Sequence, residues 1–138
     1  MIVLDASAGV NIAQDTEAGR VLSFMLEELE GEPISACDIY RAEVRNALWK
    51  YTKSGLLSTG DAIDLVHDAL DLVDEYVPIE DLGDEAFLAA STYGHPVYDM
   101  FYLCLARREG ATLLTLDKKL ANLCQRAGVN CIGEAELD

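Results

Sequence analysis

Long apolar runs are missing from this sequence of 138 residues. No stretch approaches the roughly 20 apolar residues that a membrane-spanning helix needs. Met1 leads into a short apolar run that ends in a charge, without the basic segment and the long apolar segment of a signal peptide. We therefore expect a cytoplasmic protein that does not enter a membrane. Because 51% of the residues are apolar, one core can form, and we expect a single domain spanning residues 1–138.

The motifs of several enzyme classes are also missing. Neither Gly-x-x-x-x-Gly-Lys nor Gly-x-Gly-x-x-Gly occurs, which argues against a nucleotide switch or a dinucleotide enzyme. The Gly-x-Ser-x-Gly elbow of serine hydrolases is absent as well. Only two histidines are present, and neither is favoured as a catalytic base. His67 lies in an acidic helical segment, and His95 precedes Pro96 in an expected turn.

Cysteines are few and scattered. Cys37, Cys104, Cys124 and Cys131 form no Cys-x-x-Cys pair and no pattern with histidine, which argues against a zinc site. We expect them to be small, buried, apolar residues. A disulfide between Cys124 and Cys131, joining the last helix to the last strand, is the alternative, although disulfides are uncommon in cytosolic proteins.

Positively charged residues are scarce. The chain has 10 Lys and Arg against 25 Asp and Glu, a net charge of −15, and no Lys or Arg lies between Ser54 and Ala106. Five acids in that stretch recur at steps of three and four and would share one helical face: Asp61, Asp64, Asp68, Asp71 and Glu75. A solvated face is the simplest interpretation. The alternatives are a dock for a basic partner and an adaptation to high salt.

The excess of acid also bears on nucleic acid binding, which depends heavily on cationic contacts. A polynucleotide would have to be held by a local basic patch or by a metal ion. The basic residues concentrate in residues 41–53 and 107–126. Both segments contain or adjoin a candidate functional acid.

Segments of strand and helix character alternate along the whole chain. We expect strands at residues 1–4, 33–36, 76–79, 112–116 and 130–132, and helices that begin at residue 6 and span about 17–29, 38–53, 59–73, 84–93, 96–108 and 118–127. This alternation is typical of a parallel sheet covered by helices on both faces. Such sheets bind their ligands at the carboxyl ends of the strands.

Four carboxylates occupy positions where such a fold makes them costly. Asp5 closes the apolar run 1–4 and Asp117 closes the run 111–116, so both should lie on the same rim of the sheet. Asp99 interrupts a nearly apolar helical stretch, and Glu43 lies at the margin of a core-facing helical stripe. A carboxylate removed from water must be paired, protonated or bound to a cation.

Each acid also has a local explanation. Asp5 and Asp117 precede helices, where aspartate is a good N-cap. Asp99 lies in the first turn after Pro96, where a negative charge suits the helix dipole. Glu43 is the fourth case, because it could pair with a base of its own helix: Arg41, Arg45 or Lys50.

Taken together, the four acids indicate a metal site. Mg²⁺ and Mn²⁺ prefer hard oxygen ligands, and bound metal offsets the mutual repulsion of clustered carboxylates. The chemistry that uses such a group is hydrolysis of a phosphodiester by metal-activated water, with one or two ions.

The residues around these acids resemble those of PIN-domain ribonucleases, and most of all the small VapC toxins of VapBC toxin–antitoxin pairs. Four segments carry the resemblance, in this order and spacing: Ile2-Val3-Leu4-Asp5-Ala6-Ser7, residues 40–48 around Glu43, residues 97–106 around Asp99, and Thr115-Leu116-Asp117-Lys118-Lys119-Leu120. The resemblance covers essentially the full length of the chain.

The resemblance implies a three-layer α/β/α fold with a parallel sheet of four or five strands and a metal-dependent endoribonuclease activity. Asp5, Glu43, Asp99 and Asp117 would bind Mg²⁺ or Mn²⁺, and Ser7 and Thr115 would orient the first and last acids by hydrogen bonds. It also implies a homodimer and an antitoxin partner that covers the acidic pocket.

Two interpretations from other classes stay open. A phospho-accepting signalling domain is also a small α/β unit with an acidic metal pocket, but it would have adjacent acids after the first strand and a lysine after a late one. Here Asp5 stands alone and the late strand is followed by Asp117. A non-catalytic interaction protein would use its acidic helix to bind a basic partner. The aromatic residues Trp49 and Tyr51 would stack on bases in a nuclease, but core or dimer packing is the favoured role.

Overall fold

The sheet has five parallel strands in the order β3-β2-β1-β4-β5. The computed structural model describes residues 1–133. The strands are β1 (Ile2–Leu4), β2 (Ile34–Cys37), β3 (Glu75–Val77), β4 (Thr112–Leu114) and β5 (Cys131–Ile132). The helices are α1 (Ala6–Ala13), α2 (Glu17–Glu28), α3 (Ile39–Lys53), α4 (Thr59–Asp71), the 3-10 turn η1 (Ile79–Asp81), α5 (Gly83–Tyr93), α6 (Val97–Glu109) and α7 (Lys118–Ala127).

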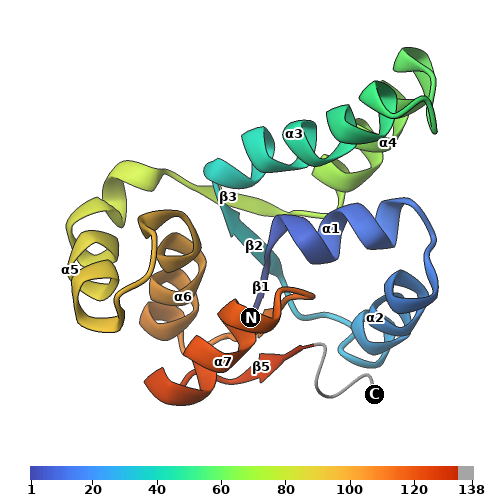
Figure 1. Ribbon diagram of the computed structural model, residues 1–138. Coiled ribbons are helices and arrows are strands. Elements are labelled where there is room, and N and C mark those ends of the chain that lie inside the picture. Colours follow the sequence, from blue (N-terminus) through green and yellow to red (C-terminus); the bar gives the residue numbers. More distant parts are fainter. Residues whose placement is uncertain (134–138) are drawn as a thin grey trace.

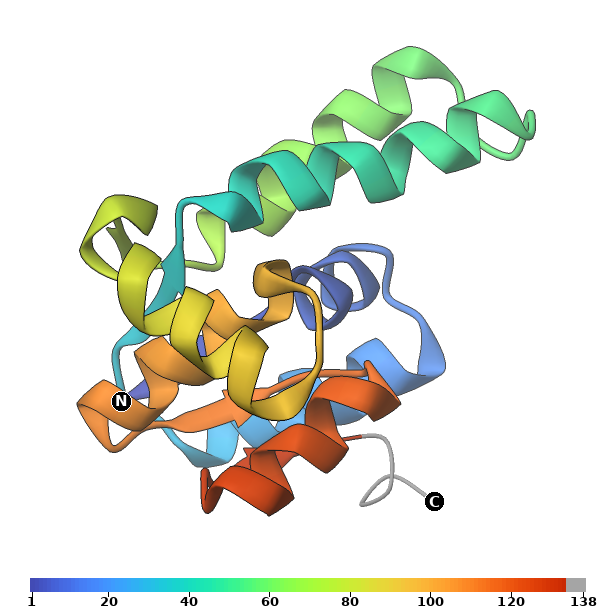
Figure 2. The same cartoon turned by 60° about the vertical axis from the view of Figure 1, so that its left-hand side comes forward.

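Helices cover both faces of this sheet, which makes three layers (Figure 1). Helices α1 to α4 lie on one side, and α5 to α7 lie on the other. Helix α6 packs on β1, β2 and β4, and its residues 100–106 are all buried. Helices α3 and α4 lie side by side and project beyond the sheet (Figure 2). The expected α/β/α fold with a parallel sheet is confirmed.

The strand order places a switch point beside the central strand. From β1 the chain moves outward to β2 and β3, and then crosses back to β4 and β5 on the other side of β1. The crevice between the carboxyl ends of β1 and β4 is where open sheets of this type bind ligands. Leu4 pairs with Leu114 in register, so Asp5 and Thr115 are the next residues on the two adjacent strands.

Several element ends differ from the sequence expectation. The expected strands 76–79 and 112–116 are in fact Glu75–Val77 and Thr112–Leu114. Pro78 lacks the N–H needed to continue β3, and the N–H of Leu116 donates to Ser7 Oγ rather than to a strand. Helix α4 ends at Asp71, so Glu75 is a strand residue and does not belong to the acidic helical face. That face therefore consists of four acids.

Among the described residues 1–133, no helix is long and apolar enough to cross a membrane. The four cysteines are free, and three of them are buried, as expected. The alternative disulfide between Cys124 and Cys131 is not formed, although a hydrogen bond joins the two thiols.

Gly9 in α1 and Gly19 in α2 allow close contacts between α1 and its neighbours. A Cβ atom at Gly9 would lie 2.2 Å from Tyr40 Oη, so Gly9 lets α1 pack against α3. A Cβ atom at Gly19 would lie 2.0 Å from the carbonyl oxygen of Asn11. Because the second clash is with backbone, the turn from α1 to α2 needs glycine at position 19.

This contact yields a stability prediction. Gly19→Ala should lower the free energy of unfolding by about 1–3 kcal/mol or more, as overpacking does in other cores. Gly60→Ala is the matched control, since Gly60 lies in the first turn of α4 and a Cβ atom there would have no neighbour within 4 Å. The control should be neutral or stabilising by up to about 1 kcal/mol. Urea unfolding measures both, and equal stabilities of the two variants would contradict this account of the α1–α2 turn.

Candidate metal site at the carboxyl edge of the sheet

Asp5 is the innermost acid of the site. It follows β1 directly and is only 4% exposed. Its Oδ1 accepts hydrogen bonds from Ser7 Oγ (2.7 Å) and from the Ala8 backbone N–H (2.9 Å), and its Oδ2 accepts one from Thr115 Oγ1. The side chain therefore caps α1, as the local explanation predicted, while two hydroxyls and one N–H fix its orientation. Both hydroxyls implied by the resemblance, those of Ser7 and Thr115, bind the first acid, Asp5, whereas Thr115 contacts the last acid only at the Asp117 backbone N–H.

Burial makes the charged form of Asp5 expensive. It raises the pKa of this carboxyl from 3.8 to about 7, although the hydrogen bonds of Thr115, Ala8 and Ser7 act in the opposite direction. The negative charge of Asp99 raises the pKa further. Near neutral pH, Asp5 is thus partly protonated unless a cation compensates its charge.

Glu43 projects from α3 and is held by a tyrosine. The hydroxyl of Tyr102, on α6, donates to Glu43 Oε1 at 2.6 Å across two layers of the fold. Burial raises the pKa of Glu43; the Tyr102 hydrogen bond lowers it, and the charges of Asp99 and Asp117 raise it. Within residues 1–133, Glu43 forms no ion pair with Arg41, Arg45 or Lys50, and Arg41 pairs with Asp38 instead.

Asp99 lies in the first turn of α6, beside a histidine. Its Oδ2 is 2.8 Å from His95 Nε2, and both side chains are largely shielded from solvent, at 24% and 17% exposure. His95 lies just before α6, since Pro96 is the N-cap of this helix, and Asp99 lies in its first turn. His95, which the sequence disfavoured, is therefore part of the surroundings of the site.

Asp117 caps α7 at the end of the loop that follows β4. Its Oδ1 accepts from the backbone N–H groups of Lys119 (2.8 Å) and Leu120 (3.2 Å). The Asp117 N–H donates to Thr115 Oγ1, the same hydroxyl that binds Asp5. Thr115 therefore links the first and the last of the four acids.

The four carboxylates influence one another, but in this structure each also has a partner of its own. Asp99 raises the pKa of Asp5 and of Glu43, and Asp117 raises that of Glu43. Within residues 1–133, no group of three or more His, Cys, Asp or Glu side chains is arranged tightly enough to hold a metal ion. The acids are thus electrostatic neighbours, and bringing their oxygens onto one ion requires side-chain adjustment.

The chemistry of the donor set fits a hard divalent cation. All four candidate ligands carry carboxylate oxygens, and the hydrogen bonds of Glu43 and Asp99 engage one oxygen each. The arginine ion pairs of the structure involve other carboxylates, those of Asp15, Asp38 and Glu85. A cation would compensate both the burial of Asp5 and the repulsion among the acids.

Sequence reasoning missed two partners of the acids, His95 and Tyr102. Tyr102 looked like a core residue of the Asp99 helix, and its side chain is indeed 1% exposed. Its hydroxyl reaches Glu43, which is 59 residues away in the sequence. No local pattern signals such a contact. His95 and Asp99 are only four residues apart, but His95 precedes the helix that carries Asp99, so helical spacing does not signal their contact either.

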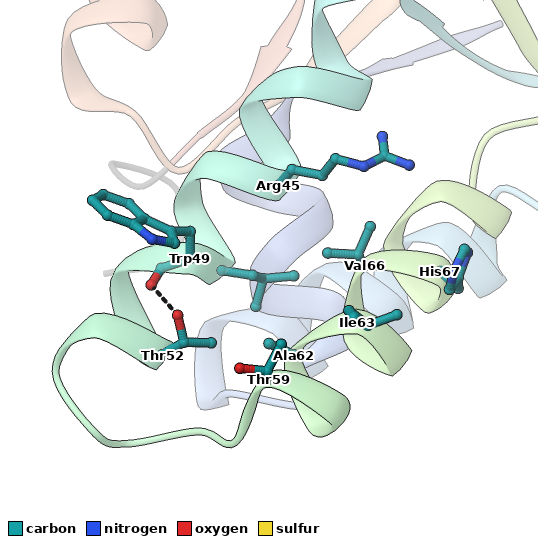
Figure 3. A pocket seen from close by; sticks show the side chains of 9 residues that line it. Arg45, Trp49, Thr52, Thr59, Ala62, Ile63, Val66 and His67 are labelled. Atoms are coloured by element: carbon teal, nitrogen blue, oxygen red, sulfur yellow. Dashed lines mark hydrogen bonds between the residues drawn. The ribbon is translucent and has the colours of Figure 1, made fainter.

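A separate pocket of about 230 Å³ lies between α3 and α4, away from the acids. Figure 3 shows the lining residues of this pocket: Arg45, Trp49 and Thr52 of α3, and Ala62, Ile63, Val66 and His67 of α4. Trp49 is 53% exposed, so of the two expected roles, core or dimer packing, it does not fill the first, while Tyr51 packs against the core. The exposed Ile63, at 51%, makes this surface apolar.

Comparisons with known proteins identify the family of this chain and relatives of similar sequence and fold. Residues 2–125 match the family described as PIN domain. Ribonuclease VapC3 of Pyrobaculum aerophilum is 32% identical over 129 residues, covering 87% of this chain and 92% of the relative. Ribonuclease VapC12 of Mycobacterium tuberculosis is 33% identical over 121 residues, covering 88% and 90%. The crystal structure of PAE2754 from Pyrobaculum aerophilum is similar in fold, with a TM-score of 0.70 at 21% identity over 99% of this chain and 90% of that one.

The raised pKa of Asp5 predicts how stability depends on pH. Because the folded protein binds this proton more tightly than the unfolded chain, ionisation of Asp5 costs stability as the pH rises from about 4 to 8. Asp5→Asn should therefore gain stability relative to the parent over that range, by up to about 4 kcal/mol in the absence of metal. Urea unfolding at several pH values, with chelator present, measures the difference.

The control is Asp64→Asn, which removes an exposed carboxylate on α4. Its stability relative to the parent should change little between pH 4 and pH 8. A difference between Asp5→Asn and the parent that does not change with pH would show that the Asp5 carboxyl titrates normally.

Proposed function

The chain belongs to the PIN-domain family, and from this premise we propose that it is a metal-dependent endoribonuclease that hydrolyses RNA phosphodiester bonds. The observation that carries the proposal is the location of Asp5, Glu43, Asp99 and Asp117 near the switch point of the sheet. There the charge of Asp99 raises the pKa of Asp5 and of Glu43, and the charge of Asp117 raises that of Glu43. The ribonuclease names of two relatives that match most of the chain support the reaction class.

The proposed ion is Mg²⁺ or Mn²⁺, held by Asp5, Glu43, Asp99 and Asp117. When bound, it would supply Lewis acidity toward phosphate oxygens and lower the pKa of water. The donor set of carboxylates suits this hard ion, and it suits zinc less, because zinc sites are usually built from cysteine and histidine ligands.

The protein's own contribution is to fix the carboxylates. Ser7 and Thr115 hold Asp5, Tyr102 holds Glu43 and His95 holds Asp99. Burial raises the pKa of Tyr102, so this hydroxyl stays protonated and acts as a donor to Glu43. Partners of this kind typically contribute 10–100-fold to metal affinity or activity. No side-chain nucleophile is needed for this reaction.

We also propose that the protein is a toxin that works with protein partners. The VapC names of the relatives suggest a toxin–antitoxin pair, and the exposed apolar surface at Trp49 and Ile63 offers a place for a second copy or for an antitoxin. The homodimer, the antitoxin and the cytoplasmic location stay predictions.

The alternative functions make different demands on the acids. Membership of the PIN-domain family argues against the phospho-accepting domain. A non-catalytic protein that binds a basic partner through α4 would not need the carboxylates at the switch point, and it is the outcome that a negative nuclease test would favour.

The proposal predicts the effect of removing one acid. Asp99→Asn should reduce cleavage of single-stranded RNA in Mg²⁺ or Mn²⁺ by more than about 100-fold, since even the outer partners of a metal ligand are worth 10–100-fold. The fold should be retained, because the change relieves repulsion. Asp84→Asn, at the exposed start of α5, is the matched control and should cleave at the parental rate.

Gel analysis of a labelled RNA, with and without chelator, provides the measurement. Cleavage by Asp99→Asn at the parental rate, with no effect of chelator on either protein, would contradict the proposal.

A further inference from the structure

A groove of about 390 Å³ runs along the seam between α1 and α3. It is lined by Ser7, Val10 and Asn11 of α1 and by Ala47, Lys50 and Tyr51 of α3, and it continues past the end of α3. Figure 1 shows the two helices next to each other on the same face of the sheet. This groove is separate from the pocket between α3 and α4 and shares no lining residue with it.

One end of the groove touches the acid site. Ser7, which lines the groove, donates to Asp5 Oδ1 and accepts from the Leu116 N–H. On the other wall, Glu43 precedes Ala47, Lys50 and Tyr51 by four, seven and eight residues on the same helix, so it shares their face. The groove therefore leads away from the four acids along one direction.

The charge of the groove is opposite to that of the protein as a whole. None of its lining residues is acidic, although the chain carries 25 acids and a net charge of −15. Its one cation, Lys50, has no ion-pair partner within residues 1–133. Lys50 lies on α3 seven residues beyond Glu43, so their backbone positions are about 10 Å apart along the helix axis.

The other bases of α3 are engaged elsewhere. Arg41 pairs with Asp38 and lies over the ring of Tyr76, 3.7 Å from its centroid. The guanidinium of Arg45 donates to the carbonyl oxygen of Arg41. Lys53 lies over the ring of Trp49, 5.4 Å from its centroid. Lys50 is thus the base of α3 that remains for an anionic ligand in the groove.

The groove also has apolar surface beside this charge. Val10, Ala47 and the partly buried ring of Tyr51 form its walls, and Leu56, 73% exposed, stands at its far end. A single-stranded nucleotide presents a phosphate and an apolar base face together, and proteins bind it with a cation and apolar or aromatic contacts. A groove with one unpaired lysine and an apolar wall matches this combination.

We propose that the α1–α3 groove binds the RNA nucleotide next to the scissile phosphate, with Lys50 contacting its phosphate and the wall around Val10 and Tyr51 receiving its base. The inference rests on the proposed nuclease function, because it states where the RNA substrate lies beyond the four acids. Lys50 is a substrate-binding residue in this assignment and takes no part in holding the metal ion.

Binding of RNA that cannot be cleaved tests the groove directly. The probe is a fluorescein-labelled, single-stranded RNA oligonucleotide of mixed sequence, titrated with protein in the Asp99→Asn background and followed by anisotropy. The comparison is between Asp99→Asn alone, Asp99→Asn with Lys50→Ala, and Asp99→Asn with Lys53→Ala. Lys53 is the matched control, because it is a lysine on the same helix that lies on Trp49 and does not line the groove.

Lys50→Ala should weaken RNA binding by about tenfold, in keeping with one charge-assisted hydrogen bond, and Lys53→Ala should change it by less than about twofold. The slope of log affinity against log salt should fall in magnitude by about 0.7 for Lys50→Ala, as expected for one lost phosphate contact on a single strand. Equal affinities of the two lysine variants, or an unchanged salt slope, would overturn the proposal and would favour a protein segment as the occupant of the groove.

The outcome is independent of the nuclease test. If the parent protein cleaves RNA but Lys50→Ala binds it as tightly as Lys53→Ala does, only the groove assignment fails. If the parent protein does not cleave RNA at all, the nuclease proposal fails, and a selective loss of RNA binding in Lys50→Ala would still support the groove as an RNA site.

Discussion

Asp5 places a carboxylate at the end of the central strand, 4% exposed, with two hydroxyls and one backbone N–H around it. Hydrogen bonds alone do not offset the loss of water, because burial still raises its pKa to about 7. A fold that keeps such a group retains a free-energy cost that a bound cation would remove. The charge of Asp99 adds to this cost, and the charges of Asp99 and Asp117 likewise raise the pKa of Glu43.

The topology of the sheet produces this arrangement. Parallel strands β1 and β4 are adjacent, and their register makes Asp5 and Thr115 neighbours at the switch point. Helix α6, packed on the sheet, brings Asp99 and Tyr102 toward the same edge, and α3 brings Glu43. The hydroxyl of Thr115 then joins Asp5 to the backbone of Asp117. Residues from four separate segments thus lie near one edge of the sheet, because the packing of the core determines where each segment ends.

The layers of the fold and the positions of Asp5 and Asp117 could be predicted from the sequence. An acid that directly follows a buried apolar run lies at the carboxyl edge of a parallel sheet. Glu43 and Asp99 could be proposed from their helical faces. The contact of Tyr102 with Glu43 was beyond local patterns, since it depends on how α3 and α6 pack. The misplacement of Glu75 has a similar origin: its spacing fits the acidic helix, but pairing of its backbone with Ser35 makes it a strand residue.

The central claim is that the four acids together form one site for a divalent cation. Anomalous diffraction from crystals soaked in Mn²⁺ tests this claim most directly. The account predicts an anomalous peak at the carboxyl edge of β1 and β4, coordinated by oxygens of at least three of Asp5, Glu43, Asp99 and Asp117. A peak on the acidic face of α4 with none at the switch point, or no peak at millimolar Mn²⁺, would contradict it.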